Sequence, residues 1–566
     1  MATAIVPTED VADRVSGYRY AVAVRGGDVW QVETHPDDPS HRIERQAEYQ
    51  VGSGNHAIAW VAAENGFLTE LPVGWFRTEA GWQMNPGYEL KNHRFSRPIP
   101  PGCVACHGTQ ATHESPTINR FRLPIADGID CSRCHGGSEQ HIAFWKSPGT
   151  KNPLLSAQLV HPGRLAADRA NDICLQCHLQ GDVSVPIGRL STFDFQPGQR
   201  LIDLRHDFLI AGQPATLGIA SHGARMLQSR CYAASGGQLT CVLCHDPHRP
   251  TTDFNASSYD AKCLACHQPK ACSRPLAEES KRATSGCVGC HMPKQPTREG
   301  IHLVFTDHAI RRRPAALASA LPPVLAADAD VELTSTWPGT KPDAATLGAA
   351  YVLLHETMGP QLQSLARGSK LLAETVAHNP KDGDSRYWLG SALLALQRPL
   401  EARDELQKVL LEQPTRHEAR FRLALAEEAL GNTSGATGEY QRLLADVANW
   451  REPYERLAQL YLLQHKPAEA TGVWRKLVSL QPDAAAYASL ALAERLAGAS
   501  HEQALATVEK ALALDSRQPA AYVSRGTLWL LAGRSSDARR DFERALRLDP
   551  ANTAARQAID ALPGGK

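Results

Sequence analysis

The sequence has no long apolar segment, no excess of charge of either sign and very few methionines. No run of 18 apolar residues occurs in the 566 residues, so we expect no transmembrane helix in this chain. The 60 basic side chains are balanced by 60 acidic ones, which argues against nucleic acid as a partner. The first ten residues also lack the basic and apolar regions of a signal peptide.

Cysteine is scarce too, but twelve of the 14 cysteines are concentrated in one repeated motif, Cys-x-x-Cys-His. Its six copies are Cys103–His107, Cys131–His135, Cys174–His178, Cys241–His245, Cys263–His267 and Cys287–His291. This motif is the attachment site of c-type haem, because two thiols on one helical turn can each bond to a single porphyrin. The histidine that follows then points at the iron as its proximal ligand.

Two other uses of paired cysteines fit the pattern less well. A Cys-x-x-Cys pair is also half of a tetrahedral zinc site, but zinc does not require a histidine directly after the second cysteine. Histidine makes up 23 of 566 residues, about 4%, so its presence after all six pairs is not a matter of chance. A thioredoxin-like redox site would need one dithiol and not six.

The motifs therefore predict six covalently attached c-type haems. The predicted attachment residues are Cys103, Cys106, Cys131, Cys134, Cys174, Cys177, Cys241, Cys244, Cys263, Cys266, Cys287 and Cys290, and the predicted proximal iron ligands are His107, His135, His178, His245, His267 and His291. Such haems are attached outside the cytoplasmic membrane. We therefore expect a periplasmic or extracellular protein whose signal peptide has been removed or replaced.

The sixth position of each iron also needs a ligand, and electron carriers usually supply a second histidine or a methionine. The chain has only five methionines, so histidine is the expected ligand. By sequence context we predict the distal ligands His56, His141, His222, His248, His302 and His308. His141 and His248 follow their own motifs too closely to reach the far side of the same haem, so each should ligate a neighbouring one. The remaining histidines before residue 311 are expected to be structural or exposed: His35, His41, His93, His113, His161 and His206.

The predicted fold is multidomain. Residues 1–95 contain short alternating segments separated by Gly, Asn and Pro, with a hairpin signal at Gly26–Asp28, and predict a small antiparallel β module. Its expected core is Trp30, Trp60, Trp75, Phe76 and Trp82. Residues 96–310 carry the six motifs, with 189 residues from the first cysteine to the last histidine. That is about 32 residues for each haem, so we expect a mostly α-helical and irregular domain in which haems pack on one another.

An Ala- and Pro-rich linker is predicted over residues 311–343, followed by an all-α repeat solenoid over residues 344–566. Pro380, Pro414, Pro482 and Pro550 lie on a grid of 34 residues, the period of the tetratricopeptide repeat. Five full repeats over 381–550, a degenerate one before them and a C-terminal cap are expected, which makes about six repeats. The seven-residue period of a coiled coil is absent.

Two interpretations remain for the other cysteines and for the basic residues near the motifs. Cys231 and Cys272 are expected to form a disulfide or to remain idle thiols, and an axial thiolate or redox pair is the alternative. Arg120, Arg122, Arg133 and His113 could bind an anion, but solvated charges or partners of haem propionates are favoured.

From the β module through the linker, the chain resembles a family of multihaem cytochromes that end in tetratricopeptide repeats. The resemblance rests on the segments Val51–His56, Glu70–Trp75, Asn85–Tyr88, Gly128–His141, Cys241–His248 and Thr306–His308. The haem region is also similar to the superfamily of pentahaem nitrite reductases and octahaem hydroxylamine oxidoreductases. That similarity implies haems stacked in close parallel and perpendicular pairs.

The activity of these enzymes does not carry over with the resemblance. The nitrite reductases commonly bind their catalytic haem through Cys-x-x-Cys-Lys, whereas all six motifs here end in His. The hydroxylamine oxidoreductases cross-link theirs to a tyrosine, for which Tyr232 is a weak match.

Three functions follow from these observations. The leading hypothesis is an exported protein that carries electrons through six haems, with the repeat array docking a redox partner protein. The second is an oxidoreductase that acts on a small nitrogen or sulfur compound at one five-coordinate haem. The third is a structural subunit of a larger electron-transfer assembly organised by the repeats.

Overall fold

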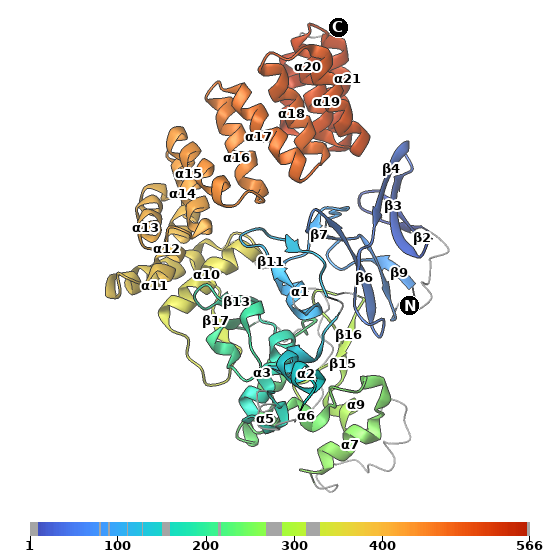
Figure 1. The fold of residues 1–566 in the computed structure, drawn as a ribbon, viewed down its shortest axis with the longest axis vertical. Helices are drawn as coiled ribbons and strands as arrows, with labels where there is room; N and C mark the ends of the chain where they lie inside the picture. The colour runs from blue at the N-terminus through green and yellow to red at the C-terminus, as the bar shows by residue number, and fades with distance from the viewer. Residues whose placement is uncertain are drawn as a thin grey trace.

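The structure is a computed structural model that describes residues 10–78, 81–88, 91–109, 111–126, 128–149, 159–212, 217–267, 286–300, 302–312 and 329–562. Figure 1 shows three regions: strands near the N-terminus, short helices in the middle of the chain, and an arc of paired helices that runs to the C-terminus. The end of the arc returns to the N-terminal strands, so the first and last regions of the chain lie side by side.

The N-terminal region is β-rich, as predicted. Its first sheet has the order β1 (Val11–Ala12), β2 (Arg19–Arg25), β3 (Asp28–His35) and β4 (Asp38–Gln46), all antiparallel. The tight β2–β3 turn is formed by Gly26 and Gly27, whose φ angles of 62° and 97° are ones that glycine adopts readily. Tyr20 and Val22 are buried in this sheet.

The second sheet has the order β10-β7-β6-β8-β9, with β5 also paired to β6. Its strands are β5 (Tyr49–Val51), β6 (Ala57–Glu64), β7 (Phe67–Glu70), β8 (Val73–Phe76), β9 (Gly81–Met84) and β10 (Arg97–Pro98). Trp60 stacks on Trp82, with ring centroids 4.9 Å apart, and Trp60 and Phe76 are buried. Trp30, Trp75 and Trp82 are half-buried, so the predicted aromatic core is partly at the surface.

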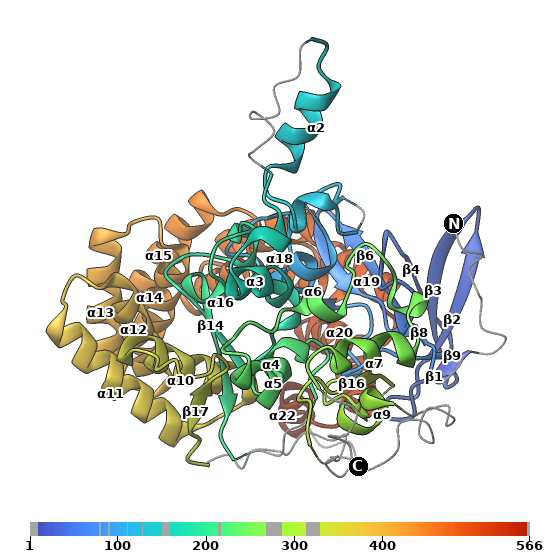
Figure 2. The ribbon, with the colours of Figure 1, turned by 90° about the horizontal axis from the view of Figure 1, so that it is seen from below.

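The middle region is built from short elements. Its helices are α1 (Pro101–His107), α2 (Ser138–Lys146), α3 (Ala167–His178), α4 (His222–Leu227), α5 (Arg230–Ala234), α6 (Cys241–Cys244), α7 (Ala256–Leu264) and α9 (Cys287–His291). Its strand pairs are β11 (Thr112–His113) with β12 (Phe121–Arg122), β13 (Val183–Pro186) with β14 (Arg205–Ile210), and β15 (Lys294–Pro296) with β16 (Val304–Thr306). Figure 2 shows α2 projecting away from the rest of the molecule.

Part of the predicted linker is structured. Leu333–Ser335 form strand β17, which pairs antiparallel with β14. Val331 and Leu333 are buried against Val183, Phe208 and the first repeat helix. Apolar and polar residues alternate from 331 to 334, which explains this strand, because one side of it faces an apolar core.

The C-terminal region is an all-α solenoid of helix pairs. The pairs are α10 (Ala344–Met358) and α11 (Leu362–His378), α12 (Gly383–Ala395) and α13 (Pro399–Glu412), α14 (His417–Ala429) and α15 (Thr433–Asp446), α16 (Arg451–Leu463) and α17 (Pro467–Leu480), α18 (Ala484–Leu496) and α19 (His501–Leu514), and α20 (Pro519–Leu531) and α21 (Ser535–Leu548). Helix α22 (Thr553–Ala561) follows them. Gly526 lets α20 approach α21 closely, because a Cβ there would lie 2.7 Å from a ring carbon of Phe542.

The C-terminal repeats contact the N-terminal sheet through charged groups. Arg94 donates to Asp515, in the turn between α19 and α20, at 2.6 Å, and to the buried Glu33 of β3 at 2.9 Å. His41 of β4 lies 2.9 Å from Glu33 and 3.1 Å from the hydroxyl of Ser516. These four side chains and Ser516 are called the β–repeat interface below.

Candidate functional site

The Cys-x-x-Cys-His motifs lie on short helical turns. The backbone N–H of His135 donates to the carbonyl of Cys131 at 2.8 Å, and the same contact joins His245 to Cys241 and His267 to Cys263, each at 2.9 Å. Such a turn brings residues one and four of the motif to one side of the backbone. The two thiols can therefore meet the same porphyrin, as the attachment chemistry requires.

Hydrogen bonds at Nδ1 fix the orientation of several imidazoles. Nδ1 of His135 donates to the carbonyl of Val160 at 3.0 Å, and Nδ1 of His291 donates to that of Arg311 at 2.7 Å. A carbonyl can only accept, so Nδ1 must carry the proton and Nε2 is left with its lone pair. This is the arrangement that haem iron needs from a histidine ligand. The residues present fit c-type haem in this respect.

Thiols from different motifs lie in contact. Cys106 of the first motif is hydrogen-bonded to Cys177 of the third, and this bond lowers the pKa of Cys106. Cys174 of the third motif contacts Cys241 of the fourth in the same way. Cys263 of the fifth motif contacts Cys287 of the sixth. The cysteines of motifs one, three and four thus form one group, and those of motifs five and six form another.

Two of the predicted distal ligands lie together between motif histidines. His222 begins α4, and its ring centroid is 5.5 Å from that of His178 and 5.0 Å from that of His308. The ring of His308 is in turn 6.0 Å from that of His245. Burial, together with the nearby imidazoles of His308 and His178, lowers the pKa of His222 to about 3. The ring is therefore neutral at physiological pH, as an iron ligand must be.

The segment around His222 is shaped for close approach to the third motif. A Cβ on Gly223 would lie 2.8 Å from the carbonyl oxygen of His178, so only glycine fits between α4 and the end of α3. The N–H groups of Ile219 and Ala220 donate to Glu299 at 3.1 Å and to Gln180 at 2.8 Å. Nδ1 of His222 is buried and has no hydrogen-bond partner among the described residues.

His248 lies beside the second motif. Its ring centroid is 6.0 Å from that of His135, and the two ring planes differ by 15°. The side chain of His248 is 75% exposed.

The other three predicted distal ligands are more dispersed. His141 lies on helix α2, which projects from the rest of the molecule (Figure 2). The centroid of its ring is 6.2 Å from that of Trp145. His56 contacts Phe305 at 4.8 Å, and Phe305 also contacts His222 at 5.4 Å, which places His56 near the histidine group. His302 packs on Phe76 of the N-terminal sheet at 5.0 Å.

Several histidines expected to be structural are engaged by protein groups. Both ring nitrogens of His41 have partners in the β–repeat interface. Nε2 of His113 lies 2.6 Å from the carbonyl of Thr117, and Nε2 of His206 lies 2.8 Å from the hydroxyl of Ser335. His161 differs, because its ring is 6.3 Å from that of His135. Sequence context contained no signal for that contact.

The anion-binding alternative has little support from the geometry. Arg120 forms an ion pair with Glu114, and Arg133 donates to the carbonyl of Ala105 at 2.6 Å. Arg122 lies exposed on β12. Tyr232 is half-buried on α5 against the core beneath α3. Cys231 has a free thiol, and Cys272, its proposed disulfide partner, lies outside the described residues.

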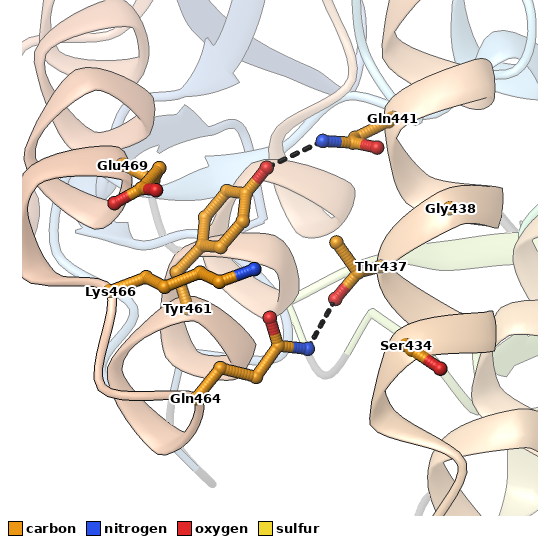
Figure 3. Close-up of a pocket in the computed structure, with 8 residues that line it drawn as sticks. All are labelled: Ser434, Thr437, Gly438, Gln441, Tyr461, Gln464, Lys466 and Glu469. Carbon is orange, nitrogen blue, oxygen red and sulfur yellow. Dashed lines mark hydrogen bonds between the residues drawn. The ribbon is translucent and has the colours of Figure 1, made fainter.

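A separate pocket lies within the repeats. It has a volume of about 430 Å³ and is formed by α15 and the α16–α17 hairpin (Figure 3). Gln441 donates to the hydroxyl of Tyr461 at 2.6 Å, and Gln464 donates to that of Thr437 at 2.9 Å. The pocket is polar, open at the surface and formed by residues that belong to none of the six motifs.

The six Cys-x-x-Cys-His motifs, on short helical turns and with further histidines beside them, are those of a multihaem cytochrome c. Comparison with known proteins supports this class. The family model "Cytochrome c554 and c-prime" matches residues 82–136, and the tetratricopeptide repeat model matches residues 361–417 and 495–553. These matches confirm the predicted combination of a multihaem cytochrome and a tetratricopeptide repeat array.

Relatives match parts of the chain. The multiheme cytochrome MtrA of Shewanella baltica (strain OS185) is 27% identical over 165 residues, which cover 27% of this chain and 46% of MtrA. The chain thus spans about half the length of this relative. A thermophilic tetratricopeptide repeat protein of Thermus thermophilus is 24% identical, with 32% of this chain and 97% of that one covered and a TM-score of 0.26. MamA of Desulfovibrio magneticus RS-1 is 20% identical, with 31% and 98% covered and a TM-score of 0.28.

Within the part of the chain that the structure describes, no helix combines the length and the apolar character needed to cross a membrane.

Proposed function

We propose that this protein is an exported cytochrome that carries electrons through six covalently attached haems. When bound, c-type haem supplies iron that gains and loses single electrons. The observation that carries the proposal is the contact between thiols of different motifs: Cys106 with Cys177, Cys174 with Cys241, and Cys263 with Cys287. Each of these cysteines would attach one haem, so the contacts would hold haems of different motifs next to one another.

The same contacts suggest an order for the haems. The first, third and fourth motifs form one contact group. The second motif lies beside it, because the thiol of Cys174 is close enough to raise the pKa of Cys134. The fifth and sixth motifs form the second contact group. The two groups approach each other at Cys244 of the fourth motif and Cys266 of the fifth, whose thiols interact electrostatically. The motif cysteines would therefore hold the haems in the order first, third, fourth, fifth and sixth motif, with the second motif beside the third, and bound haem would supply iron that gains and loses single electrons.

The proposed role of the protein side chains is to attach the haems and to hold their iron ligands. The motif cysteines attach the porphyrins, and the motif histidines are the proximal ligands. As distal ligands, His248, His222 and His308 would each act together with the motif histidine that their rings approach, which is His135, His178 and His245, respectively. His56, His141 and His302 complete the proposed set of distal ligands.

We further propose that the repeat array docks a redox partner protein, either transiently or within a larger electron-transfer assembly. Tetratricopeptide solenoids commonly bind other proteins. One edge of the array already contacts this chain's own N-terminal half, through the turn at Asp515 and through Leu480, whose carbonyl accepts from Asn65 at 3.1 Å. A partner would therefore bind to the remaining surface of the array.

A second candidate function is an oxidoreductase acting on a small nitrogen or sulfur compound at an open iron. The position of His141 favours it, because α2 carries this histidine away from the other motifs (Figure 2). A haem without its distal histidine would have an open coordination site.

The proposal is tested by the intact mass of the exported protein and by its ferric EPR spectrum. The expected mass is that of the chain plus six haems, and the expected spectrum contains only low-spin signals. A high-spin signal that shifts when nitrite or hydroxylamine is added would favour the oxidoreductase. A mass with fewer than six haems would refute the proposed electron path.

A further inference from the structure

A buried ion pair joins the two segments that carry His222 and His308. Arg225 of α4 donates from Nε to Oδ1 of Asp307 at 2.9 Å and from Nη2 to Oδ2 at 2.7 Å. Their side chains are 6% and 3% exposed. Arg225 follows His222 by three residues, about one helical turn, and Asp307 directly precedes His308. The pair thus connects the immediate surroundings of two predicted iron ligands that are 86 residues apart (308 minus 222).

The geometry of this pair restricts both segments. A planar guanidinium that makes two parallel hydrogen bonds to a carboxylate fixes the relative orientation as well as the distance of its partners. Asp307 is itself held, since its N–H donates to the carbonyl of Pro293 at 3.1 Å and its Oδ1 accepts from Ala309 at 3.0 Å. On the other side, Glu299 and Gln180 hold the turn before His222. The pair supplies the remaining constraint, at the other end of α4.

A buried ion pair is a poor source of stability compared with apolar side chains of similar size, because both charges lose their hydration. A role in positioning explains this one better. The pair lies between His222 of α4 and His308, which follows β16.

We propose that Arg225 and Asp307 are positioning residues that set the distance and the orientation between His222 and His308, so that each imidazole meets its own iron. The two rings lie 5.0 Å apart at 76°, and each is next to a different motif histidine, His178 or His245. This inference rests on the proposed function, which makes His222 and His308 distal ligands. Loss of the pair leaves both histidines in the chain but removes the contact that fixes their segments relative to one another.

The decisive variant replaces both charges by apolar groups of similar size, R225M/D307L, so that no unpaired charge is buried. Its matched control is R525M/D541L in the repeats. There Arg525 makes the same two-bond contact with Asp541, at 2.9 Å for both bonds, far from the motifs in sequence. Both proteins are exported with their haems, and the haem content is checked by intact mass. The spin state is measured by EPR and near-infrared magnetic circular dichroism, and the midpoint potentials by titration.

R225M/D307L is expected to keep six haems but to lose the low-spin signal of one or two of them. A high-spin signal should replace it, and added imidazole should restore the low-spin form. The control should keep the low-spin signals and midpoint potentials of the parent. An R225M/D307L protein with the spin states and potentials of the parent would overturn the inference while leaving the electron-transfer proposal intact. A parent protein without the six haems would instead overturn the proposed function, and the inference with it.

If R225M/D307L does not accumulate, R225K replaces it. Lysine keeps the charge but cannot form the two-bond fork. The same partial loss of low-spin signal is expected, and an unchanged spectrum would again refute the inference.

Discussion

The substitution Arg94→Met tests whether the last repeats are held by the β–repeat interface. Arg94 bonds to Glu33, whose side chain is 0% exposed, and to Asp515, which is 10% exposed. Removing the guanidinium would leave a fully buried carboxylate whose hydrogen-bond partners among the described residues are His41 and Tyr20. Breaking a buried ion pair in this way costs about 3–5 kcal/mol. Arg94 is itself 22% exposed, so we expect the lower end of that range, about 3 kcal/mol.

The loss should appear locally, by amide hydrogen exchange. Since each 1.4 kcal/mol corresponds to a factor of ten, amides around the α19–α20 turn should exchange about a hundredfold faster in R94M. The control is Arg398→Met, which breaks an ion pair with Glu401 whose two side chains are 51% and 54% exposed, and it should leave the exchange rates of the α19–α20 turn unchanged. Equal protection of the α19–α20 turn in R94M and the parent would refute this account of the interface.

Three further predictions concern packing, iron ligation and pH. Gly526→Ala should lower the free energy of unfolding by about 1–3 kcal/mol, because its new methyl group would lie 2.7 Å from a ring carbon of Phe542. In the control Gly472→Ala the methyl group meets open space, so this variant should be neutral or stabilising. Thermal melts of both variants test this difference. His248→Ala should convert one low-spin haem to high spin and His378→Ala none, and EPR showing no change in the first would exclude His248 as a ligand. Burial raises the pKa of Glu70 to about 7 despite its ion pair with an arginine, so the folded state binds this proton more tightly than the unfolded state. Stability should therefore fall as pH rises from about 4.5 to 7, and urea titrations of Glu70→Gln should show a weaker fall.

The sequence allowed prediction of features that depend on neighbouring residues or on a regular period. The six motifs need only five consecutive residues each, and the turn that brings Cys131 and Cys134 together forms within the motif itself. The 34-residue grid of prolines identified the repeats because each helix pair packs on the next in the same way. The predicted β-rich character of the N-terminal region followed from short alternating segments.

Features that join distant segments were beyond local reasoning. The Arg94–Asp515 contact spans 421 residues and the Arg225–Asp307 pair spans 82. Neither pair has a local pattern that marks its partner. Strand β17 was missed for a related reason, because three residues in a segment rich in proline and alanine become a strand only when β14 is available to pair with them. The ranking of histidines by context likewise could not show that α2 carries His141 outward or that His161 approaches His135.

The repeat array is attached to the first half of the chain at both of its ends, and these attachments determine where its helices first separate from one another. A stack of repeats in which each contacts only its neighbours normally frays from its termini. Here the first helix, α10, is packed on the β13–β14–β17 sheet, and the turn before α20 is tied to the N-terminal strands by buried charges. The repeats between them, around α14–α17, are joined to the first half of the chain by exposed hydrogen bonds, such as those from Asn65 to the carbonyl of Leu480 at 3.1 Å and from Ser115 to Glu418 at 3.4 Å.

Spontaneous opening should therefore begin in this interior stretch, where the pocket at Tyr461 also lies. In this protein the middle repeats, and not the terminal ones, should be the most easily labelled and the first to be cut by a protease.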